Sequence, residues 1–177
     1  MRRRIVRETP DELERLQELL DRSIEEAGAF LRSSFQMPTH SLSARQLATY
    51  LQGIQTVAFS TVTAAGQPRV APIGAIFHRA EFYIPTVMTA MRTRHVSRRP
   101  PISLTHYDGI DLAIIVHGRA VIINQEQPEF DTLEAIHRTS GSESVRDWGE
   151  GAFLRVMADV IFTFARFPER FPERRDV

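Results

Sequence analysis

The sequence predicts an α+β protein that is mainly β, built around a six-stranded antiparallel barrel with a long N-terminal helix. The middle of the chain holds short β-branched runs that are separated by turn residues. Its helical patterns do not alternate with these runs as parallel βαβ units require. The 177 residues are enough for one domain with a sizeable core.

Residues 1–40 are predicted to form a helical extension ahead of the barrel. Thr9 can cap a helix, and Glu12, three positions later, completes a capping box. Apolar residues then recur at helical spacing, so we expect one amphipathic helix over residues 10–34. Residues 35–40 are predicted to be a linker.

Residues 41–166 are predicted to form the barrel domain. A short helix is expected after Ser43, because Ser43 and Gln46 form a second capping box. Alternating and β-branched patterns predict strands over residues 55–63, 68–77, 81–86, 102–106, 111–123 (bent at Gly118) and 153–165. The remaining patterns predict helices over 89–99 and 128–138, a surface loop over 139–151 and a non-regular tail over 167–177.

Two missing residue types restrict the chemistry. The chain has no cysteine, which excludes disulfides, zinc ribbons and thiol catalysis. It also has no lysine, because all 22 basic residues are arginine. A lysine Schiff base and a P-loop lysine are therefore excluded. Any bound anion must be held by arginine, histidine, hydroxyl groups or backbone amides.

The charge and hydropathy patterns argue against nucleic-acid and membrane partners. The formal net charge is zero, so the chain lacks a strongly basic footprint for nucleic acid. No apolar run reaches the length of about 18 residues that a transmembrane helix needs. The basic run at residues 1–4 is not followed by an apolar segment, so no secretory signal is expected. We therefore expect a cytoplasmic protein.

The six histidines show no spacing that is typical of metal ligands, so no metal site is expected. His106 and His117 lie on successive predicted strands and could meet across the sheet. Either histidine would be the place to look for a haem ligand if the barrel bound haem.

Residues 43–125 carry a connected set of motifs. They comprise the hairpin GIQTVAFSTVTAAGQPRVAPIGAIF, the strand EFYIPT, the basic helix TAMRTRHVSRRPPISL and the strand IDLAIIVHGRAVI. This pattern resembles the flavin-binding split β-barrel superfamily. That group includes the pyridoxamine 5′-phosphate oxidases, the deazaflavin-dependent reductases and haem-degrading relatives. The resemblance implies a split barrel of the FMN-binding type and a homodimer that binds FMN between its subunits.

The resemblance also implies a phosphate site. In the family, a threonine that ends one strand is followed six residues later by a phosphate-binding lysine, and a proline comes eight residues after that lysine. Thr86, Arg92 and Pro100 keep both intervals, so Arg92 takes the place of the lysine. Ala90 and Met91 replace a serine and an arginine of the family motif. Thr89, Thr93 or Arg94 could compensate for these replacements, and the amides that open the helix could supply further contacts to a phosphate dianion.

The strand around residues 70–74 would carry the flavin ring, since its small residues let a planar ring approach the backbone. Arg69 resembles the arginine that opens this strand in the family, and Ala113 replaces a ring-contacting glutamine of the oxidases. Trp148 and Arg155 are distant counterparts of a segment that binds substrate and flavin. The flavin-binding set that the resemblance implies is Arg69, Val70, Ala71, Pro72, Ile73, Gly74, Thr86, Thr89, Met91, Arg92 and Trp148.

The leading hypothesis is therefore an FMN-binding oxidoreductase that acts on an unidentified small molecule. The cofactor carries the hydride chemistry, so no catalytic residue is assigned. Turnover of pyridoxamine phosphate itself is not expected, because the segment around Arg155 departs from the family pattern. One alternative is a deazaflavin-dependent reductase, with Arg94 and Arg98 as contacts for the more acidic cofactor. Another is a non-catalytic flavin- or haem-binding module.

Overall fold

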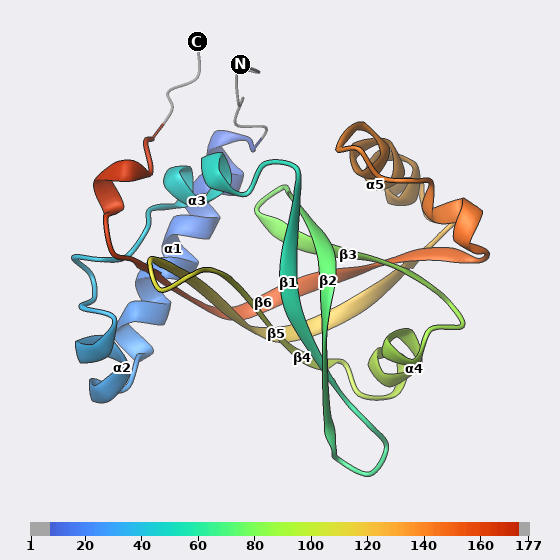
Figure 1. The fold of residues 1–177 in the computed structure, drawn as a ribbon, viewed down its shortest axis with the longest axis horizontal. Helices are drawn as coiled ribbons and strands as arrows, with labels where there is room; N and C mark the ends of the chain where they lie inside the picture. Colours follow the sequence, from blue (N-terminus) through green and yellow to red (C-terminus); the bar gives the residue numbers. More distant parts are fainter. Residues whose placement is uncertain (1–7, 174–177) are drawn as a thin grey trace.

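The fold is a closed antiparallel barrel of six strands in the order β1-β2-β3-β6-β5-β4 (Figure 1). The computed structural model describes residues 8–173. The basic run at residues 1–4 and the last four residues of the predicted tail lie outside that range. The strands are β1 Ile54–Val62, β2 Pro68–His78, β3 Glu81–Val87, β4 Pro101–Asp108, β5 Leu112–Asn124 and β6 Gly151–Ala165. The prediction of a mainly β, six-stranded antiparallel barrel is confirmed.

The β5–β6 ladder is irregular at one point. The pairing runs from Leu112 with Ala165 to Asn124 with Ala152, and its register shifts between His117 and Gly118. A Cβ atom at Gly118 would lie 2.2 Å from the carbonyl oxygen of Met157, which is far inside van der Waals contact. The two backbones can approach this closely only because residue 118 is glycine. The bend that the sequence predicts at Gly118 is thus present as a bulge.

Strand β2 separates from its neighbour over most of its length. It pairs with β3 only through Ile76–His78, whereas its pairing with β1 extends from residue 68 to residue 76. Among the strands of residues 8–173, residues 68–75 are therefore paired with β1 alone. The β1–β2 hairpin projects beyond the rest of the barrel (Figure 1). We call residues 68–75 the open edge of β2.

The single N-terminal helix predicted over residues 10–34 is wrong, because the chain forms two helices there. Helix α1 covers Pro10–Glu26 and α2 covers Ala29–Ser34. Ala27 and Gly28, between them, have extended backbone angles. The guanidinium of Arg32 stabilises this break, because its Nη2 donates to the carbonyls of Ile24, Glu25 and Ala27 at 2.9, 2.7 and 3.3 Å. Ile24 and Glu25 lie in the last turn of α1, where carbonyl groups lack the i+4 amide partners of a continuous helix.

The other helices lie close to where the sequence predicts them. Helix α3 covers Ala44–Tyr50, α4 covers Met91–Arg98 and α5 covers Pro128–Thr139. The capping boxes at Thr9 and Ser43 are both formed. The loop predicted over residues 139–151 contains a 3₁₀ turn, η1, at Val145–Trp148, and a second turn, η2, covers Pro168–Arg170 in the tail.

Two apolar clusters hold these elements together. The larger cluster fills the barrel and extends to the buried faces of α1 and α3. The smaller one lies under α5 and consists of Ile76, Tyr83, Ile123, Phe130, Leu133, Val145 and Phe153. Helix α1 is also fixed to β6 by a hydrogen bond, because the Ile161 amide donates to the Ser23 hydroxyl oxygen at 3.0 Å. Over residues 8–173, no helix has the length and apolar character needed to cross a membrane.

Candidate functional site

A cavity of about 430 Å³ lies between the β1–β2 hairpin and the start of α4. These elements come from separate parts of the sequence, and α4 lies beside the hairpin (Figure 1). The cavity brings together Arg69, Val70, Ala71, Ile73, Met91 and Arg92 from the predicted flavin-binding set. The other lining residues are Phe59, Thr61, Thr63 and His95, which that set does not include. We call this space the α4 cavity.

Arg92 is the central charge of the α4 cavity. Its Nη1 donates to the Thr86 hydroxyl oxygen at 3.3 Å. No carboxylate of residues 8–173 lies within ion-pair distance of the guanidinium. Burial lowers the pKa of Arg92 from its ordinary value, because desolvation penalises its charged form. A half-buried guanidinium without a counter-ion can gain an anionic ligand at a low desolvation cost.

A chain of two hydroxyl groups orients Arg92. The Thr93 hydroxyl donates to the Val87 carbonyl at 2.8 Å and lies 3.1 Å from the Thr86 hydroxyl. A hydroxyl carries one proton. Thr86 therefore donates to Thr93, and its oxygen accepts from Arg92. Both threonines are almost fully buried, so in this structure Thr86 positions the arginine.

The start of α4 leaves backbone donors available near Arg92. Its N-cap residue is Ala90, whose side chain cannot accept a hydrogen bond from the first amides of the helix. Helix N-termini of this kind carry partial positive charge and attract anions. The sequence places the helix start at residue 89, but the first helical residue is Met91. Thr89 is exposed and lies in the turn before the helix.

The hairpin side of the cavity offers an apolar wall and unpaired backbone. Val70 is 69% exposed and Met91 is 60% exposed, which is high for apolar side chains. Both side chains line the cavity. The open edge of β2 passes this wall and has backbone N–H and C=O groups without a strand partner on one side. A planar heterocycle can use both features, since its faces are apolar and its edge carries donors and acceptors.

Five residues of the predicted set do not line this cavity. Thr86 lies behind Arg92, and Pro72, Gly74 and Thr89 are outside the lining. Gly74 has a packing role, because a Cβ there would lie 2.9 Å from an Ile54 methyl group. Trp148 lies in η1, where its ring meets His137 edge-on with centroids 5.6 Å apart.

The two candidate haem ligands differ in availability. His106 is 7% exposed, and both of its ring nitrogens are hydrogen-bonded. Nδ1 lies 2.9 Å from the Thr56 carbonyl and Nε2 lies 2.9 Å from the Tyr50 hydroxyl. His106 therefore cannot bind a haem iron without losing one of these bonds. His117 is exposed and has its Nδ1 2.7 Å from the Ser103 hydroxyl.

A second, more basic cavity lies on the other side of Met91 and His95. It has a volume of about 480 Å³, and Arg94, Arg98 and Arg99 contribute three guanidinium-bearing side chains to its lining. Thr63, Met91 and His95 line both cavities. The two spaces therefore adjoin along α4.

Comparison with solved structures confirms the architecture. The conserved hypothetical protein Rv2991 from Mycobacterium tuberculosis superimposes with a TM-score of 0.62 at 17% identity, over 79% of this chain and 95% of that one. General Stress Protein 26 from Bacillus anthracis gives 0.55 at 18% identity, over 67% and 91%. A structure described as an F420 reductase gives 0.51 at 15% identity, over 63% and 91%. No curated protein matches the chain.

The fold is that of a split-barrel protein, and the α4 cavity lies beside its β1–β2 hairpin. The pyridoxamine 5′-phosphate oxidase family model matches residues 43–163, which include all of β1–β5 and most of β6. The chain belongs to this family.

Proposed function

We propose that the protein is a homodimeric oxidoreductase that binds FMN non-covalently in the α4 cavity. The observation that carries the proposal is Arg92, a half-buried guanidinium that has no carboxylate partner within the described residues and lies at the start of a helix. An FMN phosphate is a dianion that needs a fixed cation and backbone amides.

The residues present fit this cofactor. Arg92 and the first amides of α4 would hold the phosphate, while Thr86 and Thr93 hold the guanidinium in place. The apolar wall formed by Val70 and Ile73 would support the ring. When it is bound, FMN supplies hydride acceptance and donation. The chain would bind and orient the ring and shield it from water.

A second copy of the chain would complete the site. Val70 and Met91 are exposed at the cavity, so one subunit leaves apolar surface uncovered there. An isologous dimer across this face would cover both side chains and close the cavity over the ring. The substrate of such an enzyme is a small molecule that we do not identify.

The test is to measure FMN binding by the Arg92→Gln variant, using the quenching of flavin fluorescence as the signal. We expect the dissociation constant to rise about tenfold to a hundredfold, since a hydrogen bond to a charged group contributes about 1.5–3 kcal/mol. The control is Arg98→Gln, which removes an arginine from the same helix but not from the α4 cavity. Equal FMN affinity in the parent and in Arg92→Gln would refute the phosphate site. Oxidation of NADPH by the loaded protein would then separate an enzyme from a flavin-binding module.

The alternative cofactor is a deazaflavin, and the second cavity is the observation that favours it. Its three arginines adjoin the α4 cavity and could hold a longer acidic tail. If this alternative is correct, Arg94→Gln and Arg98→Gln weaken deazaflavin binding and leave FMN binding unchanged. Competition between the two cofactors for the parent protein shows which one is preferred.

A further inference from the structure

His95 is a residue of the α4 cavity that the proposed function leaves without a role. It lies three positions after Arg92 in α4, and both side chains line the cavity. Residues at this spacing are neighbours on one face of a helix. The Cα–Cβ bonds of a helix also tilt toward its N-terminus. His95 therefore leans toward the turn that holds Arg92, where the phosphate of FMN would bind.

Thr61, on β1, holds the ring of His95. The Thr61 hydroxyl oxygen lies 2.8 Å from His95 Nδ1, and Thr61 is 3% exposed. Among residues 8–173, this hydroxyl has no other hydrogen-bonding partner. Because a buried hydroxyl proton without an acceptor is costly, Thr61 donates and Nδ1 accepts. The single N–H of the neutral imidazole is then at Nε2, which bonds to no group of the described chain. His95 therefore has a free N–H donor at the cavity wall.

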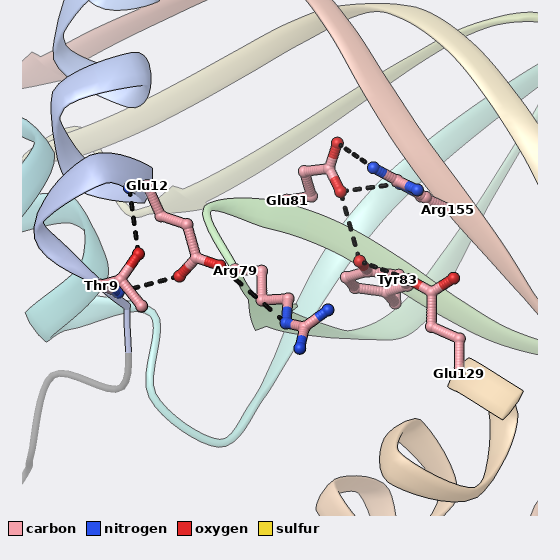
Figure 2. Close-up of polar contacts among 7 residues, drawn as sticks. All are labelled: Thr9, Glu12, Arg79, Glu81, Tyr83, Glu129 and Arg155. Atoms are coloured by element: carbon pink, nitrogen blue, oxygen red, sulfur yellow. Dashed lines mark hydrogen bonds and ion pairs between the residues drawn. The ribbon is translucent and has the colours of Figure 1, made fainter.

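The surroundings of His95 carry positive charge without acidic partners. At the other end of β3, arginines are paired with carboxylates: Arg155 Nε lies 2.7 Å from Glu81 Oε2, and Arg79 Nε lies 3.9 Å from Glu12 Oε1 (Figure 2). The two cavities beside α4 have no acidic side chain in their linings. Their arginines lie beyond ion-pair distance of every carboxylate of residues 8–173; they are Arg69, Arg92, Arg94, Arg98 and Arg99. A free N–H donor in such surroundings favours an anion.

The start of α4 lacks other side-chain donors that could share a phosphate with Arg92. Ala90 and Met91 have none to offer. The replacements that the sequence suggests do not line the α4 cavity; they are Thr89, Thr93 and Arg94. The only proton of the Thr93 hydroxyl is donated to the Val87 carbonyl, and Arg94 lines the second cavity instead. His95 is thus the side-chain donor that the fold places beside Arg92.

We propose that His95 is a phosphate-binding residue, which donates from Nε2 to the phosphate of FMN while Thr61 holds its ring. This role rests on the proposed function, because the anion that it takes is the phosphate of that cofactor. A phosphate dianion has several acceptor oxygens, so the Arg92 guanidinium and the imidazole N–H can bind it together. Thr61 is a positioning residue, since its hydroxyl fixes the tautomer that leaves the proton on Nε2.

The experiment compares the binding of FMN and riboflavin to the full chain, using flavin fluorescence quenching as the signal. Riboflavin has the same ring as FMN and lacks the phosphate. The decisive variant is His95→Phe, which keeps a planar ring and removes both nitrogens. His95→Gln is the conservative variant, because its amide nitrogen can donate near the position of Nε2. Circular dichroism checks that each variant is folded.

We expect His95→Phe to raise the dissociation constant of FMN about tenfold, since one hydrogen bond to a charged group is lost, and that of riboflavin by less than about twofold. His95→Gln should recover part of the FMN affinity. Thr61→Val, which removes the hydroxyl and keeps the shape, should weaken FMN binding less than His95→Phe does. The matched control is His40→Phe, which should bind FMN like the parent. His40 is also half-buried and bonded through Nδ1, but it lines neither cavity beside α4.

The role of His95 is overturned if His95→Phe keeps the FMN affinity of the parent, or if it weakens FMN and riboflavin by the same factor. It is also overturned if ¹⁵N NMR of the parent at about pH 9, where an ordinary imidazole is neutral, finds the proton on Nδ1. These outcomes leave the proposed function standing as long as the parent binds FMN and Arg92→Gln binds it more weakly. Failure of the parent to bind FMN would instead refute the proposed function and the role of His95 together.

Discussion

The substitution Gly118→Ala tests the closest backbone approach in the barrel. An added Cβ would lie 2.2 Å from the Met157 carbonyl oxygen and 3.0 Å from the Ala158 Cα. All of the nearest atoms belong to the backbone of β6, so no side chain can rotate away to make room. The β5–β6 ladder would have to open by about 1 Å at its bulge to restore ordinary contact distances of about 3.5–4 Å between carbon atoms.

The expected cost is about 3 kcal/mol of unfolding free energy. Overpacking usually costs about 1–3 kcal/mol, and the upper end applies here because backbone must move. For a chain of this size, about 3 kcal/mol corresponds to a fall in Tm of about 6–12 °C. Urea unfolding followed by circular dichroism measures the first quantity, and thermal unfolding measures the second.

The matched control is Gly28→Ala. It makes the same chemical change, but no atom lies within 4 Å of the added Cβ and the φ angle of −61° suits any residue. We expect this variant to lie within about 0.5 kcal/mol of the parent. If Gly118→Ala is as stable as Gly28→Ala, the close approach of β5 to β6 at residue 118 is refuted.

Two further predictions concern the helices. Arg32→Met removes the donor that caps the end of α1 and should lower the unfolding free energy by about 1–2 kcal/mol. The control, Arg22→Met on the exposed face of α1, should have little effect. Equal losses of unfolding free energy in the two variants, measured by urea unfolding, would contradict the capping role. His137 in α5 is 2% exposed, and burial lowers its pKa. The unfolded chain therefore takes up a proton near the ordinary pKa of about 6.5 that the folded chain resists, so stability should fall as the pH drops through that region and should not depend on this group at higher pH. Urea unfolding at several pH values gives the unfolding free energy as a function of pH. This free energy should change less with pH in His137→Gln than in the parent, and an equal pH dependence would refute the role of His137.

Local patterns predicted the starts of α1, α3 and α5 but not the break that separates α1 from α2. The capping boxes at Thr9 and Ser43 need only residues three positions apart, so they are visible in the sequence. The break at Gly28 is hidden, because the apolar spacing continues across it from Ala27 to Leu31. What stabilises the break is Arg32, whose bonds to the preceding carbonyls depend on the chain having already turned.

In the candidate site, too, residues of local motifs were predicted, whereas contacts that depend on the folded chain were not. The family resemblance implied a role for Arg92 and for the start of β2. The fold brings Arg92 to one cavity with four residues of that strand, Arg69, Val70, Ala71 and Ile73. The supporting role of Thr93 was not predicted, since it depends on the carbonyl of Val87, the last residue of β3. The hydrogen bonds of His106 could not be predicted from the sequence, because its partners Tyr50 and Thr56 lie 50 or more positions away.

The open edge of β2 has a consequence for self-association. An unpaired strand edge is a template on which another chain can add a strand, and such additions lead to aggregation. Two of the residues in this stretch, Pro68 and Pro72, have no N–H to donate to an incoming strand. A foreign strand therefore cannot form a continuous ladder there, while a small heterocycle that needs only one or two backbone bonds can still be accommodated.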